Sequence, residues 1–138
     1  MFYNNDKDKK KGSSLVNIAS LLIHAAKIDE NFSTKEEEII KISLLELGAK
    51  KERLNMIIEN AKKIEEESNQ ILDFTREVKN MSEDKKIKII ETLWRVIYSN
   101  KEEDMYESNL MRRLSGLLYI DNKSMGDIKE KIKKEYLK

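Results

Sequence analysis

Residues 21–47 read LLIHAAKIDENFSTKEEEIIKISLLEL. This stretch predicts a buried helix, a short acidic turn, and a second helix that begins at a capping box formed by Ser33 and Glu36. Much of the pattern returns 71 residues further along, where residues 92–118 read TLWRVIYSNKEEDMYESNLMRRLSGLL. The repeated pattern indicates a bundle built from two helix-turn-helix units.

The composition favours an all-α fold with a single domain. The 138 residues include no proline and four glycines, so few positions force a helix to end. A β-rich fold would need turn residues at about every 8–12 positions, and no segment alternates strictly between apolar and polar residues. Cysteine is absent, which excludes disulfides and thiolate metal sites.

Helical periodicity predicts seven helices along the chain. Their approximate ranges are 15–27, 34–47, 50–66, 69–79, 83–98, 104–118 and 125–137. The first and fifth are apolar except for one narrow polar stripe, so we expect them in the centre of the bundle. Gly48 is expected to end the second helix. We predict that residues 1–12 form a disordered basic tail and that residues 13–138 form one domain.

Positive charge is concentrated at the two ends of the chain, although the net charge is only +1. Residues 1–11 carry four lysines and two aspartates, and residues 123–138 carry six lysines and three acids. The small net charge argues against a nucleic-acid partner. We interpret the ends as solvated; the alternative is contact with an acidic protein partner or weak peripheral contact with an anionic membrane surface. A protein partner is expected, although the sequence does not identify it.

The lysine-rich start followed by an apolar run imitates a signal peptide. Four polar residues interrupt the run, however: Asn17, Ser20, His24 and Lys27. Their spacing places them on one stripe of a helix, which a secretory segment does not need. No uncharged run of about 18 residues predicts a transmembrane helix. We therefore expect a core helix here and a cytoplasmic protein.

In both repeated units a polar turn residue stands seven positions before a glutamate: Asp29 before Glu36, and Asn100 before Glu107. An apolar helix precedes each turn, and an apolar pair follows each glutamate. This pattern resembles the tellurite-resistance protein B (TerB) family, whose signature is an alanine-rich helix, an Asp-Gly pair and a later glutamate, usually present twice. The resemblance covers about residues 13–120. It implies an all-helical fold, a link to tellurite and stress response, and no established catalytic activity.

The resemblance also implies a divalent-cation site at the turn acids. The candidate ligands are Asp29, Glu30, Glu36, Asn100, Glu102, Asp104 and Glu107, of which Asp29 and Glu36 are the strongest. Oxygen ligands of this kind suit Ca²⁺ or Mg²⁺. An EF-hand is excluded, because a loop that starts at Asp29 has Thr34 where glycine is needed. The alternative interpretation is that Asp29 and Glu36 only stabilise the start of the second helix.

The function that we favour is a non-catalytic binding or scaffold module. The alternative is a small metal-dependent enzyme that uses Asp29, Glu36 and His24. His24 is the only histidine in the chain, and we expect it to be a hydrogen-bonded interior residue. Arg95 takes the same position in the second unit, where pairing with a turn acid is expected. Trp94 is assigned to the core.

Overall fold

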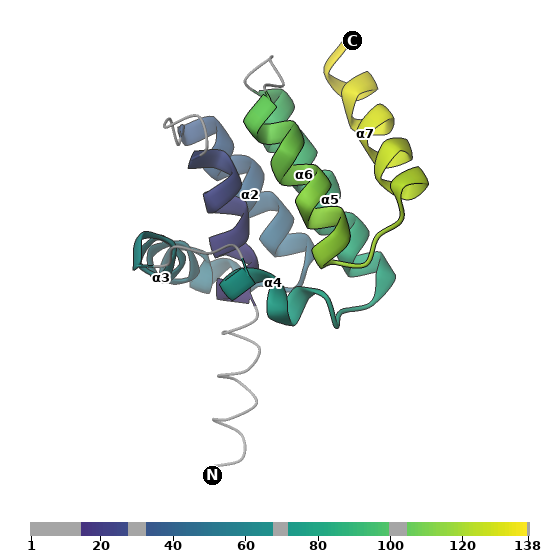
Figure 1. The fold of residues 1–138 in the computed structure, drawn as a ribbon. Coiled ribbons are helices and arrows are strands. Elements are labelled where there is room, and N and C mark those ends of the chain that lie inside the picture. The colour runs from purple at the N-terminus through teal and green to yellow at the C-terminus, as the bar shows by residue number, and fades with distance from the viewer. Residues whose placement is uncertain (1–14, 28–32, 68–71, 100–104, 138) are drawn as a thin grey trace.

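The computed structural model describes residues 15–27, 33–67, 72–99 and 105–137, and throughout these ranges the regular structure is helical (Figure 1). An N-terminal helix covers residues 15–26. It is followed by α2 (Thr34–Glu46), a 3₁₀ turn (Lys51–Arg53), α3 (Leu54–Glu67), α4 (Leu72–Val78), α5 (Glu83–Ser99), α6 (Met105–Leu117) and α7 (Asn122–Leu137). The prediction of an all-α fold is confirmed. The predicted tail, residues 1–12, lies outside the described residues.

The two helices expected in the centre of the bundle are the most deeply buried. In the N-terminal helix every residue from 18 to 23 is buried, and α5 buries ten of its residues, including Ile89, Leu93 and Ile97. A single hydrophobic cluster joins them to residues of α2, α3, α6 and α7. Burial of this apolar surface, at roughly 25 cal/mol per Å², is the main force that holds the helices together.

Buried hydroxyl groups in the centre have hydrogen-bond partners. Ser43 of α2 and Thr92 of α5 lie 2.6 Å apart between their oxygens, and Thr92 also donates to the carbonyl of Lys88 at 2.9 Å. Ser20 donates within its own helix to the carbonyl of Val16 at 2.8 Å. The Ser43–Thr92 bond joins α2 to α5, and each of these three buried hydroxyls has a hydrogen-bond partner.

Two helices end in the same way, at positions 71 residues apart. Gly48, at φ 107°, follows α2, and the amide of Ala49 donates to the carbonyl of Leu44 at 2.9 Å. Tyr119, at φ 57°, follows α6, and the amide of Ile120 donates to the carbonyl of Ser115 at 2.9 Å. Both are Schellman endings, and the first confirms the predicted role of Gly48.

The seventh helix begins three residues earlier than predicted. Asp121 precedes it, and its carboxylate accepts a hydrogen bond of 2.6 Å from the amide of Ser124. This bond lowers the pKa of Asp121 and satisfies an amide at the start of α7. The sequence prediction placed the start of this helix at Met125, where the apolar periodicity begins, and overlooked the cap.

The last helix, α7, packs along α5. Its buried residues Ile128 and Ile132 join the core cluster. No helix in the described ranges is both long enough and apolar enough to cross a membrane.

Candidate functional site

Glu36 is the predicted cation ligand whose side chain the structure describes. The Ser33 hydroxyl accepts a hydrogen bond from the Glu36 amide at 3.1 Å, and Glu36 Oε1 accepts one from the Ser33 amide at 2.9 Å. The predicted capping box is therefore confirmed. The Glu36 residue is 1% exposed, at a helix end that stabilises negative charge by about 0.3–1 kcal/mol.

The other six predicted ligands share one property: the structure does not describe their side chains. They are Asp29, Glu30, Asn100, Glu102, Asp104 and Glu107. For Glu107 the backbone is described, as part of α6, and the other five lie outside the described residues. Within the described part of the chain, no three His, Asp or Glu residues form a group that could hold a metal ion. The cation site therefore stays a prediction.

His24 joins the N-terminal helix to α3. Its Nδ1 lies 3.3 Å from Oε1 of Glu65, and Lys27 Nζ donates to Oε2 of the same carboxylate at 2.8 Å. The Phe74 ring lies beside His24, with 6.1 Å between the ring centroids. The expected hydrogen bond of His24 is thus confirmed, but its side chain is 31% exposed rather than interior.

Arg95 pairs with Glu135 of α7. The side chains of the turn acids in its unit lie outside the described part of the structure, so the predicted pairing with one of them stays a prediction. Arg95 Nε donates to Glu135 Oε2 at 3.1 Å, and Nη2 donates to Oε1 at 3.2 Å. This hydrogen bonding lowers the pKa of Glu135 and raises that of Arg95. One turn earlier on α7, Lys131 donates to Glu91 Oε2 at 2.6 Å. The two ion pairs fix α7 in register along α5.

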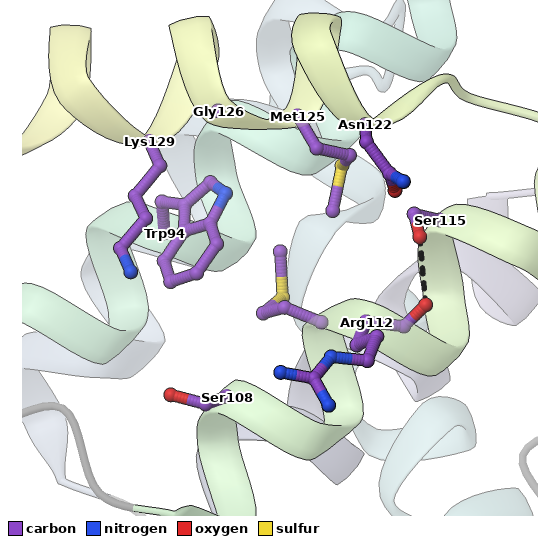
Figure 2. Close-up of a pocket in the computed structure, with 9 residues that line it drawn as sticks. Trp94, Ser108, Arg112, Ser115, Asn122, Met125, Gly126 and Lys129 are labelled. Atoms are coloured by element: carbon purple, nitrogen blue, oxygen red, sulfur yellow. Dashed lines mark hydrogen bonds between the residues drawn. The ribbon is translucent and has the colours of Figure 1, made fainter.

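Three helices enclose a groove of about 260 Å³ (Figure 2). Trp94 comes from α5; Ser108, Met111, Arg112 and Ser115 come from α6; Asn122, Met125, Gly126 and Lys129 come from α7. The ion pairs between α5 and α7 therefore also hold two of the walls of this groove together.

The apolar part of the groove consists of Trp94 and two methionines, Met111 and Met125, all of them mostly buried. The Trp94 ring stacks on Tyr98, with a centroid distance of 5.8 Å and an interplanar angle of 22°. Lys129 Nζ lies 5.3 Å from the Trp94 ring centroid, within the range of a cation–π interaction. The indole nitrogen is buried without a hydrogen-bond partner among the described residues, which costs about 1–3 kcal/mol.

The charged part of the groove is basic. Among the nine lining residues that the structure describes, Arg112 and Lys129 are charged and none is an acid. The Ser115 hydroxyl donates to the carbonyl of Arg112 at 2.7 Å (Figure 2), and its oxygen remains an acceptor. An apolar surface with two cations beside it suits a ligand that combines an apolar group with negative charge.

Gly126 leaves space in the α7 wall of this groove. A Cβ atom added at Gly126 would meet no other atom within 4 Å, so close packing does not require a glycine there. A glycine inside a helix is less favourable than alanine by about 0.8–1.0 kcal/mol. The fold therefore carries a less stable residue where a side chain would narrow the groove.

The groove was not predicted from the sequence, because its walls come from three helices and periodicity does not give the way in which helices pack against one another. Trp94 was assigned to the core, and its burial confirms that assignment. A glycine inside an amphipathic helix, one position after a core methionine, was the available signal.

The described part of the chain is thus an all-helical bundle with a basic groove between its last three long helices. The model of the family described as "Tellurite resistance protein TerB" matches residues 15–130. Because this match spans most of the 138 residues, the chain belongs to the TerB family, and the resemblance drawn from the sequence is confirmed. No curated protein and no solved structure matches the chain.

Proposed function

We propose that this chain is a non-catalytic binding module of the TerB family that acts in tellurite or stress response. The family match over residues 15–130 carries this proposal. The basic, apolar groove supports a binding role, since a few directed polar groups around an apolar surface are typical of ligand sites. A cytoplasmic location is part of the proposal and rests on the sequence argument alone.

The proposed module binds Ca²⁺ or Mg²⁺ at the acidic turn before α2. Support comes from Glu36, a buried carboxylate at the start of a helix, and from the position of Asp29 seven residues before it. A carboxylate offers about four lone-pair positions, so the capping box does not by itself decide between a cap and a ligand. Full coordination would need further oxygens, because Ca²⁺ takes about 6–8.

The runner-up function is an enzyme that uses Asp29, Glu36 and His24. Two of these residues have structural partners: Glu36 completes the capping box, and His24 faces Glu65. These structural roles of Glu36 and His24 support the binding module.

A titration with metal ions tests the cation site. At 100 times its Kd, a bound ion should stabilise the fold by about 2.7 kcal/mol, which thermal denaturation with Ca²⁺, Mg²⁺ or Mn²⁺ would detect. Asp29→Asn combined with Glu36→Gln should abolish the gain. Ser33→Ala is the matched control: it removes the cap, lowers stability without ions, and leaves both carboxylates in place, so the gain should persist.

An unchanged melting curve for the wild-type protein in millimolar Ca²⁺, Mg²⁺ and Mn²⁺ would refute the cation site. The role of Asp29 and Glu36 would then be only to stabilise the start of α2.

A further inference from the structure

We infer that the groove between α5, α6 and α7 binds an acidic peptide segment of a partner protein, with an apolar side chain of that segment against Trp94. This inference rests on the proposed binding role and specifies the chemistry of the partner. The groove volume of about 260 Å³ lies just below the range of about 300–1,000 Å³ that is usual for drug-sized ligands. It suits one large side chain, with the rest of the peptide outside.

Charge complementarity selects an acidic partner. Arg112 and Lys129 lie on opposite walls of the groove, on α6 and α7 (Figure 2), and none of the lining residues that the structure describes is an acid. The charge continues beyond the groove, since α7 as a whole carries five lysines and three carboxylates. One of those carboxylates, Glu135, is paired with Arg95, and one of those lysines, Lys131, is paired with Glu91, so α7 keeps an excess of lysine. A buried apolar anchor surrounded by polar contacts is the usual arrangement at the centre of a protein interface.

The apolar side chain of the peptide would contact Trp94, Met111 and Met125. A flat indole face and two flexible thioethers can adapt to an inserted leucine or phenylalanine. The Trp94 ring, which stacks on Tyr98, holds its position in the wall of the groove without a hydrogen bond from its indole N–H among the described residues. Gly126 keeps the adjacent wall open, because a Cβ atom added there would meet no atom within 4 Å outside its own stretch of helix.

Synthetic peptides with glutamates on both sides of a central leucine or phenylalanine are the probe. Trp94 is the only tryptophan in the chain, so its fluorescence reports occupancy of the groove, and calorimetry measures binding independently. Titrations run in EDTA, so that failure of the cation site cannot affect the result. We expect saturable binding of the acidic, apolar-anchored peptides and none of the same peptides with lysine in place of glutamate.

Two variants locate the binding. Gly126→Leu should fill the groove and weaken peptide binding at least about tenfold while leaving the melting temperature unchanged or higher. Gly116→Leu is its matched control: Gly116 also lies in a helix with open space around it, but does not line the groove. Arg112→Glu combined with Lys129→Glu should weaken binding by a similar factor, against the control Arg113→Glu combined with Lys134→Glu.

Any of four results would overturn the inference. The first is that no saturable binding occurs up to millimolar peptide, and the second is that an acidic peptide with serine in place of its apolar anchor binds equally well. The third is that the affinity is unchanged in both groove variants. The fourth is that the protein binds only to phosphatidylcholine vesicles that contain phosphatidylserine. The last result would assign the basic surface to a membrane rather than to a protein.

Discussion

Replacing Ile132 with alanine should destabilise the protein by about 3 kcal/mol, because this residue docks α7 on the core. Ile132 is 0% exposed. The change removes three carbon atoms, worth about 0.8 kcal/mol each on burial, and leaves a cavity, so the loss should lie within the range of about 2–5 kcal/mol known for such substitutions. The Arg95–Glu135 pair cannot compensate, since it is partly exposed and contributes at most about 1 kcal/mol.

Urea denaturation followed by both circular dichroism and Trp94 fluorescence measures this loss. Trp94 is 4% exposed and lies in the groove beside α7 (Figure 2), so detachment of α7 would change its emission. Since α7 and α5 contribute to one hydrophobic cluster, we expect the two signals to change together, as in two-state unfolding. The midpoint should fall for both.

Ile42→Ala is the matched control, because it makes the same chemical change at a site on α2 that is 55% exposed. Its effect should be below about 0.5 kcal/mol. A loss below about 1 kcal/mol for Ile132→Ala, or an equal loss for both variants, would refute the docking of α7 through Ile132.

Three further predictions concern helix ends and pH. Tyr119→Gly should leave the free energy of unfolding unchanged or raise it by up to about 1 kcal/mol, because glycine adopts the positive φ of this position without strain. Gly48→Ala should lower the free energy of unfolding by about 1–2 kcal/mol, because alanine does not adopt a positive φ easily. Urea titration measures both changes, and a loss of stability in Tyr119→Gly would contradict the argument. Ser33→Ala should cost about 1 kcal/mol, measured in the same way in EDTA, and no loss would mean that the cap is unimportant. Because Arg95 lowers the pKa of Glu135, the pair stabilises the fold above the ordinary glutamate pKa, about 4.3, and this contribution is lost as the pH falls through the lower folded value. Glu135→Gln should therefore lose less stability than the wild type between about pH 7 and about pH 3, and an equal loss in both would exclude this contribution.

The helices were predictable because their determinants are local. Apolar residues at helical spacing, the near absence of glycine and proline, and the Ser33–Glu36 capping box all act within a few residues of the chain. The errors occur where another local signal competed with periodicity. At the start of α7 the Asp121 cap took precedence over the apolar pattern, and before α3 the chain forms a 3₁₀ turn, Lys51–Arg53, in place of regular helix.

Contacts between helices were less predictable, because periodicity gives the face of a helix but not its neighbour. Arg95 pairs with Glu135, 40 residues away, and the sequence did not predict this partner. That contact depends on how α7 lies along α5, which no single segment encodes. The same holds for the groove, which exists only when α5, α6 and α7 are assembled.

Two features of the groove are less favourable than simple alternatives that would serve the fold equally well. Gly126 stands inside a helix, where alanine would be more stable by about 0.8–1.0 kcal/mol and its Cβ would meet no atom within 4 Å outside its own stretch of helix. Trp94 buries a donor without a described partner, whereas the buried hydroxyls of Ser43 and Thr92 are hydrogen-bonded to each other. Since sequences depart from agreement between local and tertiary preferences mainly at functional sites, the coincidence of both departures in one groove supports binding there more strongly than either would alone.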